Sequence, residues 1–122
     1  MRGLTQAVEG FFSGFGLPVY GENAVPVGAA LPYLTVQAVE PVWDAAVPFH
    51  TRIWFRSLSD APGMAVADAI GAAIGPGGAY VPFEGGCAWI YKGRVFAQRM
   101  PMERDPGLRC IVLSLVMQAI GE

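Results

Sequence analysis

The feature that most constrains this fold is the final apolar run, the longest in the chain, which extends from Leu108 to Ile120. Both sets of alternating positions in it are largely apolar, one set being Ile111, Leu113, Leu115 and Met117 and the other Cys110, Val112, Ser114 and Val116. A strand that is apolar on both faces is typical of the middle of a sheet, where other layers cover it. The chain is therefore expected to build a layered sheet around this strand.

Two helices are predicted by apolar residues at helical spacing. The first has an apolar face made of Leu4, Ala7, Val8, Phe11, Phe12 and Phe15, followed by a glycine cap at Gly16. The second begins at an N-cap, Ser59 or Asp60, and stops at Gly75 after an apolar face made of Met64, Ala67, Ile70, Ala73 and Ile74. Its many alanines and glycines allow a close approach to a sheet.

Further strands are expected at residues 33–40, 50–57 and 80–83, where apolar and polar residues alternate or β-branched and aromatic residues gather. Pro41 should end the first of these, which most simply pairs with the second as an antiparallel hairpin. The order of elements predicts one α+β domain over residues 1–122. Its sheet is twisted, mainly antiparallel and of about four to six strands, with two helices packed on one face.

The stretch from Gly85 to Met102 carries both aromatic residues and arginines. Its two runs, Cys87–Tyr91 and Arg94–Gln98, flank Lys92 and Gly93, and this pattern predicts two strands joined by a tight turn. The outer face of the sheet would then carry Trp54, Trp89 or Tyr91, and we expect neighbouring subunits to cover it.

Composition and charge favour association with other proteins. Hydrophobic residues make up 53% of the chain and charged residues 15%, which is low for a globular protein. Residues 92–109 carry a net charge of +3 and the remainder −5, so the chain is electrically two-sided, which either orients subunits or reflects an ordinary solvated face. Cys87 and Cys110 are expected to be reduced and buried in a cytosolic protein, and no apolar stretch is long enough to span a membrane.

The sequence offers no pattern typical of catalysis or of a bound cofactor. His50 is the only histidine and no G-x-S-x-G motif is present, so a nucleophile has no evident base. His50, Cys87 and Cys110 lack metal-ligand spacing. The acidic balance disfavours nucleic-acid binding, although Trp89 and Tyr91 lie beside Lys92 and Arg94. We therefore predict a protein that is not an enzyme and has no metal and no cofactor.

Several segments together resemble a family of small proteins from the tail-morphogenesis region of long-tailed phages and prophages. They are F-F-S-G-F-G-L-P-V-Y-G-E-N-A-V-P, L-P-Y-L-T-V, I-G-P-G-G and G-G-C-A-W-I-Y-K-G-R-V-F-A-Q-R-M. Members are minor capsid or tail-completion proteins, and the tail terminator is the nearest functional class. The resemblance implies a virion subunit that forms a ring, commonly a hexamer, on the tail tube. The ring ends tube polymerisation and presents the surface to which the head connector attaches. Its partners would be further copies of itself, the tail tube protein and the head-completion or connector protein, with DNA passing through the lumen only as cargo.

A closed ring needs two different surfaces on each subunit. We hypothesise that one consists of Arg94, Gln98, Arg99 and Arg104 with the 101–107 loop, and that acidic Glu22, Glu40 or Asp44 lies on the complementary one. Three alternatives stay open: a head-completion or connector protein of the same virion, a host-encoded structural or ligand-binding module, and a small enzyme.

Overall fold

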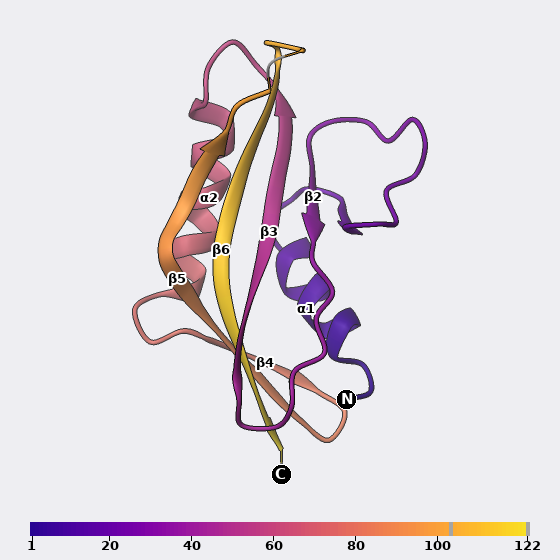
Figure 1. Cartoon of the computed structure of the whole chain (residues 1–122), viewed down its shortest axis with the longest axis vertical. Helices are drawn as coiled ribbons and strands as arrows, with labels where there is room; N and C mark the ends of the chain where they lie inside the picture. Colours follow the sequence, from indigo (N-terminus) through magenta and orange to yellow (C-terminus); the bar gives the residue numbers. More distant parts are fainter. Residues whose placement is uncertain (103, 122) are drawn as a thin grey trace.

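The computed structural model describes residues 1–102 and 104–121 and has the expected α+β architecture. In chain order its elements are α1 (Leu4–Ser13), β1 (Val19–Gly21), β2 (Tyr33–Val36), β3 (Ala46–Arg56), α2 (Ala61–Ile74), β4 (Ala79–Phe83), β5 (Gly86–Met100) and β6 (Leu108–Gly121). The strands form a six-stranded sheet in the order β1-β2-β3-β6-β5-β4. Every neighbouring pair is antiparallel except β1 and β2, which are parallel. Figure 1 shows the long strands β3, β6 and β5 along the major axis.

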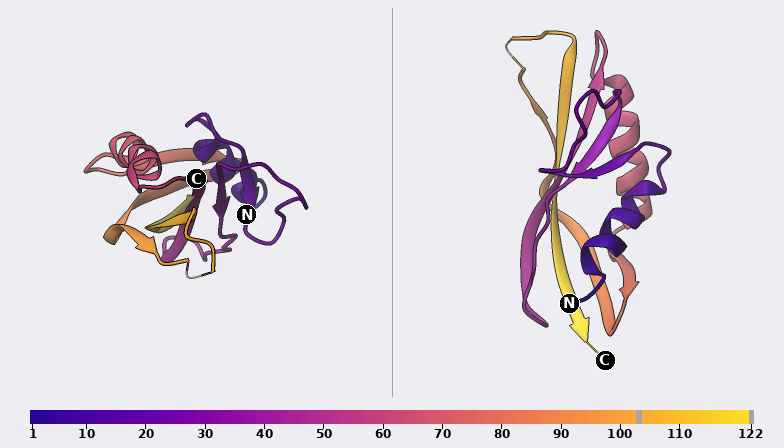
Figure 2. Two further views of the ribbon diagram at one scale, coloured as in Figure 1. Left: turned by 90° about the horizontal axis from the view of Figure 1, so that it is seen from above. Right: turned by 90° about the vertical axis from the view of Figure 1, so that its right-hand side faces the viewer.

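Strand β6 is central, as its apolar run predicts, and pairs along its length with β3 and β5. Its residues Ile111, Leu113 and Leu115 are fully buried, and Ile111 lies opposite Ile53 of β3 in the register. Both helices lie on this side of the sheet (Figure 2). On the other side, Val112 and Val116 stay half-exposed. Cys110 on that side is nevertheless buried, so the expected cover is complete on one face of the isolated chain and partial on the other.

Helix α1 packs into the core through Leu4, Val8 and Phe12, each of which is buried. It ends earlier than predicted, at Ser13, with Gly14 as its C-cap, so Phe15 lies beyond the helix. Gly16 still adopts a positive φ of 84°, which suits glycine because a side chain is strained there. The predicted helix is confirmed, but the chain turns two residues before the predicted cap.

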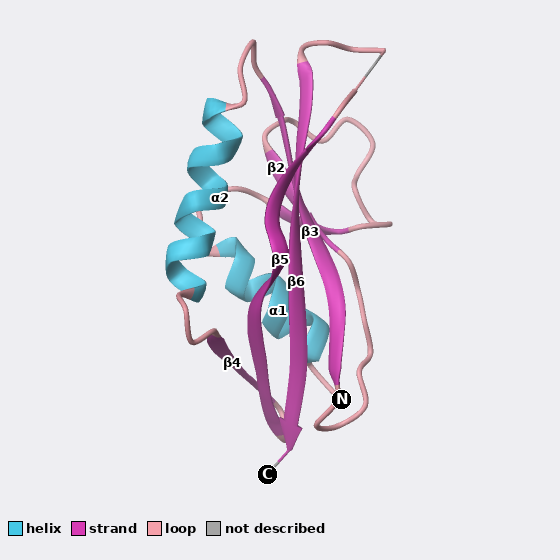
Figure 3. Cartoon of the chain, turned by 60° about the vertical axis from the view of Figure 1, so that its left-hand side comes forward, coloured by secondary structure: helices cyan, strands magenta, loops and turns pink. Residues whose placement is uncertain are grey.

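Helix α2 runs alongside the long strands (Figure 3) and contacts β3, β5 and β6. Gly63 and Gly71 are buried within it, and a Cβ at Gly63 would collide with the ring of Phe55 and come within 2.8 Å of Ile111 Cδ1. The predicted close approach is therefore achieved through glycines. Ala73, predicted on the apolar face, is exposed instead.

The predicted hairpin within 85–102 is wrong, because β5 is one continuous strand from Gly86 to Met100. Lys92 and Gly93 form no turn, since the residues on both sides of them pair with β6. The irregularity takes the form of a bulge between Lys92 and Ala97, where Val95 has a φ of 48°. Strand β6 is long enough to pair with both halves of β5, and this long-range pairing overrides the local turn signal.

The boundaries of two other strands also differ from prediction. Strand β2 ends at Val36 rather than near Glu40, whereas β3 starts at Ala46, four residues before His50. Proline has no backbone N–H to donate to a neighbouring strand. Pro48 is tolerated within β3 because β2 pairs with β3 only from Thr51 to Trp54, so no strand lies beside Pro48 on the β2 side. The antiparallel pairing of β2 with β3 is confirmed.

Candidate subunit interface

One end of the long axis is formed by the β3–α2 connection and the β5–β6 connection, and we call it the basic tip (residues 56–60, 99–102 and 104–109; Figure 1). Asp60 links its segments, because its carboxylate accepts a hydrogen bond from Arg99 at 2.6 Å and another from Arg109 at 2.9 Å. Arg109 also donates to the carbonyl oxygens of Ser57 and Leu58, both at 2.9 Å. The hydrogen bond from Arg99 is the main reason why the pKa of Asp60 lies below its ordinary value.

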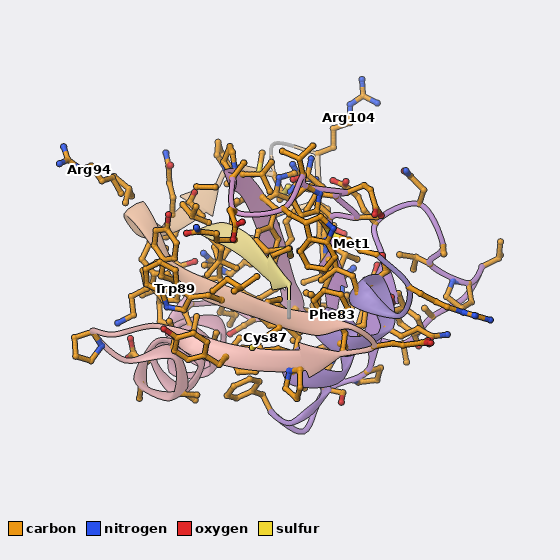
Figure 4. All side chains as sticks on the ribbon, turned by 90° about the horizontal axis from the view of Figure 1, so that it is seen from below. Met1, Phe83, Cys87, Trp89, Arg94 and Arg104 are labelled. Carbon is orange, nitrogen blue, oxygen red and sulfur yellow. The ribbon has the colours of Figure 1, made fainter. Side chains whose placement is uncertain are left out.

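The loop of the basic tip is anchored by a second carboxylate. Arg56 donates to both oxygens of Asp105, at 3.1 and 3.0 Å, and lowers the pKa of that carboxyl group. Arg104 projects away from the molecule (Figure 4). A hollow of about 380 Å³ lies beside Asp60, Arg99 and Arg109, with Met100, Pro101, Met102 and Pro106 among its other walls. The tip thus combines fixed arginines with apolar side chains, a mixture typical of protein contact surfaces.

The opposite end carries acidic residues, and we call it the acidic end (residues 1–2, 40–44 and 84). Glu40 Oε1 accepts a hydrogen bond from the amino group of Met1 at 3.1 Å, and Glu84 Oε2 lies 3.7 Å from Nε of Arg2. The backbone N–H of Asp44 donates to the carbonyl oxygen of Ala119 at 2.8 Å, which leaves its exposed side chain at the surface. Figure 1 shows the β2–β3 connection and the β4–β5 turn together at this end.

Between the two ends lies the face of the sheet that no helix covers, which we call the open face. A groove of about 510 Å³ crosses strands β3, β6 and β5 there, lined by Gln37, Pro48, Phe49, His50, Gly93, Arg94, Val112, Ser114, Leu115 and Val116. Gly93 lies close against β6, where a Cβ would be 3.0 Å from the carbonyl oxygen of Ser114. Arg94 extends outward from the molecule (Figure 4). The groove therefore has a mainly apolar and uncharged floor with an arginine at its edge.

Aromatic side chains extend the open face over β4 and β5. Tyr80 stacks on Trp89 at 6.2 Å between ring centroids, and Trp89 lies 4.4 Å from Tyr91. Trp89 is held in place by a hydrogen bond from Nε1 to the carbonyl oxygen of Gly77 at 2.9 Å. Trp54 similarly donates to Thr35 Oγ1 at 3.0 Å. These rings are rigid and partly exposed, which suits them to contact with another protein.

The seven predicted interface residues do not form two compact surfaces. Arg99 and Arg104 belong to the basic tip. Exposed Gln98 directly precedes Arg99 on β5 and faces the opposite side of the strand, and Arg94 lies farther along β5. Glu40 and Asp44 lie at the acidic end.

Glu22 is already engaged within the chain, because its Oε1 lies 2.8 Å from His50 Nε2 and 3.1 Å from Arg52 NH1. It is half-buried there, so it is poorly placed to meet the arginines of another subunit.

Sequence reasoning missed the part played by Asp60 and Arg109, which anchor the basic tip. Asp60 was predicted as an N-cap and does occupy that position, but its side chain makes no capping hydrogen bond because the two arginines use it. The sequence signal for this arrangement is weak, since 49 residues separate Asp60 from Arg109.

The contact between Glu22 and His50 joins a carboxylate to an imidazole, a pair that can activate a nucleophile when a hydroxyl or thiol group is hydrogen-bonded to the imidazole. Ser114 lies opposite His50 in the register of β3 and β6, which places a hydroxyl group near the imidazole. Among the described residues, 1–102 and 104–121, the imidazole of His50 is hydrogen-bonded to Glu22, and no hydrogen bond joins it to the hydroxyl group of Ser114. Within the same residues no cluster of three or more His, Cys, Asp or Glu side chains could hold a metal ion. In the part of the chain that the structure describes, no helix is long and apolar enough to cross a membrane.

Two solved structures have this fold. One is a chain from the virion of a native gene transfer agent (GTA) particle, with 18% identity and a TM-score of 0.58, covering 90% of this chain and 84% of that chain. The other has no functional description, with 13% identity and a TM-score of 0.59, covering 96% of this chain and 90% of that chain. No protein-family model and no curated protein matches the chain. At these identities the likeness establishes a common fold over nearly the whole chain.

Proposed function

We propose that the chain is a structural virion protein of the tail-terminator class, which caps the tail tube of a long-tailed phage or phage-like particle as a ring. The observation that carries this proposal is the fold shared with a chain of the gene transfer agent virion, with a TM-score of 0.58 over 90% of the sequence. The sequence resemblance to phage tail-completion proteins points the same way.

Exposed side chains of opposite charge at the two ends, Arg104 at the basic tip and Asp44 at the acidic end, support a role between two other protein layers. A terminator contacts the tail tube on one side and the head connector on the other, so its subunit needs two different docking ends. The basic tip, with Arg99 and Arg104 beside an apolar loop, suits a partner with acidic and apolar groups. The acidic end, with Glu40 and Asp44, suits a basic partner. Further copies complete the ring, commonly of six, and DNA passes through its lumen without being recognised.

The proposal is tested by electron microscopy of tails assembled in a particle-producing strain without this protein. A terminator predicts tubes of unregulated length. Complementation with wild-type protein should restore uniform length, whereas Arg104→Glu should restore it poorly, because the change reverses an exposed charge at the docking tip. Arg2→Glu is the matched control, since Arg2 is also exposed but belongs to the acidic end, where a further negative charge does not oppose a basic partner.

The alternative role within the virion gives a different result. A head-completion or connector protein predicts tails of normal length that lack heads. Uniform headless tails would therefore contradict the terminator assignment, and normal, complete particles would contradict any virion role.

A further inference from the structure

Helix α2 is apolar on its outer face as well as on the face that packs against the sheet. Its exposed residues are six alanines or prolines and one aspartate, namely Ala61, Pro62, Ala65, Asp68, Ala69, Ala72 and Ala73. A surface helix normally carries charged residues on its outer face, and a helix that is apolar all round is normally buried. The isolated subunit therefore leaves α2 half covered.

The apolar surface continues beside the first turns of α2. A hollow of about 280 Å³ opens there, with Leu17, Leu31 and Val66 among its walls. The outer face of α2 and this hollow form one mainly apolar surface, interrupted by Asp68 on the helix and by Arg56 at the wall of the hollow.

The open face of the sheet has the dimensions to receive such a helix. A helix of fourteen residues is about 21 Å long, whereas a strand of fourteen residues such as β6 extends for roughly 45 Å. Val112 and Val116 provide apolar contact in the groove, and Gly93 contributes no side chain that would hold a helix away. The alanines of α2 permit the close approach that this shallow groove requires.

Charge is complementary across these two surfaces. Asp68 is the single charged residue on the outer face of α2, and Arg94 extends from the edge of the groove. In the described ranges 1–102 and 104–121, neither side chain has an ion-pair partner. Each is thus free to pair with a charge on another chain.

We infer that the outer face of α2 from one copy packs into the open-face groove of the next copy, with Asp68 paired to Arg94. The two surfaces lie on opposite sides of the subunit, since α2 covers one face of the sheet and the groove lies on the other (Figure 2). Each copy therefore contacts one neighbour through its α2 surface and the other neighbour through its groove. Such a head-to-tail contact forms a ring when the rotation between copies closes. The inference rests on the proposed function, because it names the contact between copies that a terminator ring requires.

A single helix packed on a sheet makes a small interface, at the lower end of the range for specific complexes. Self-association is consequently expected to be weak in dilute solution and to strengthen at high protein concentration. The experiment must therefore compare variants over a wide concentration range.

A charge-reversal cycle tests the contact by sedimentation velocity. Asp68→Arg and Arg94→Glu should each weaken self-association about tenfold or more, and the double variant should recover most of the loss because the pair is restored with exchanged signs. Glu9→Arg is the matched control, since it makes the same change of charge at an acid of α1, outside both surfaces, and should leave association unchanged. Equal association of wild type and both single variants would overturn the inference.

Cysteine cross-linking provides a readout that does not depend on affinity. Asp68→Cys and Arg94→Cys are made in separate chains that carry Cys87→Ser, mixed at high concentration and oxidised. The disulfide-linked product should contain one chain of each kind, whereas Arg94→Cys mixed with Thr5→Cys on the outer side of α1 should give only background. A monomeric wild type together with no product above that background would overturn the contact. Loss of tail-tube binding with unchanged self-association in the α2 variants would assign the surface to another partner and would also overturn it.

The inference and the proposed function can fail separately. If the charge-reversal cycle behaves as expected but tails formed without the protein are normal, the contact stands and the terminator role fails. If tail length depends on the protein but Asp68→Arg assembles and complements like wild type, the role stands and this contact fails.

Discussion

At the scale of single residues, glycines decide how closely α2 approaches the sheet. Gly63 faces Phe55 and Ile111 so closely that even a methyl group has no space, whereas Gly10 on α1 has no atom within 4 Å of an added Cβ. Both glycines lie in helices, but only Gly63 is crowded. Replacing each with alanine therefore separates the effect of helix propensity on stability from the effect of crowding.

Gly63→Ala should lower the free energy of unfolding by about 1–3 kcal/mol, because an overpacked core must displace the Phe55 ring. Gly10→Ala should raise the free energy of unfolding by about 0.5–1 kcal/mol, since alanine favours the helix and no atom lies within 4 Å of the added Cβ. Urea denaturation of both variants measures the difference. A stabilised Gly63→Ala protein would contradict the packing described for α2.

The two cysteines differ in environment although both are free. Cys110 is buried, and desolvation raises the pKa of its thiol to about 11, whereas Cys87 is half-exposed. The expected burial is therefore correct for Cys110 and only partly correct for Cys87.

A thiol reagent at pH 8 should accordingly modify one cysteine per native chain, and the second only after unfolding, because the thiolate is the reactive form. Cys87→Ser should remove the fast reaction. Rapid modification of both thiols in the folded protein would contradict the burial of Cys110.

At the scale of elements, two arginine–aspartate clusters hold the connections of the basic tip. Asp60 joins the start of α2 to β5 and β6 through Arg99 and Arg109, and Asp105 joins its loop to β3 through Arg56. Both carboxyl groups have pKa values below the ordinary value. Their contribution is therefore fully present above the unfolded-state pKa of about 4 and is lost as the pH falls through the lower folded-state pKa values.

Thermal stability should consequently decrease as the pH is lowered below about 4. Asp60→Asn should show a shallower decrease, because one of the two titrating carboxylates is gone. Asp68→Asn is the control and should retain the wild-type slope, since Asp68 is exposed and has no ion pair within the described ranges. Melting temperatures measured by circular dichroism at several pH values compare the three proteins, and identical slopes would contradict the anchoring role of Asp60.

At the scale of the whole molecule, the chain covers one face of its sheet with its own helices and leaves the other open. The basic tip and acidic end lie at the two ends of the long axis, so end contacts and side contacts use different residues. This separation would let a subunit meet copies of itself sideways while it meets different proteins above and below, as the proposed ring requires.

Sequence pattern alone determined which segments are helices and which strand is central. The alternation from Ile111 to Met117 and the helical spacing of Leu4, Val8 and Phe12 predict burial that the structure confirms. These predictions succeed because periodic apolar residues must share a face, whatever the chain packs against.

Tertiary structure alone decided the path of β5 and the partners of the charged residues. Lys92 and Gly93 carry a local turn signal, but pairing with β6 on both sides keeps the strand continuous. Glu22 and Asp60 are ordinary surface acids in the sequence, yet His50, Arg52, Arg99 and Arg109 engage them across 28 to 49 residues. Such contacts depend on which elements lie side by side, and a linear pattern does not specify that neighbour relation.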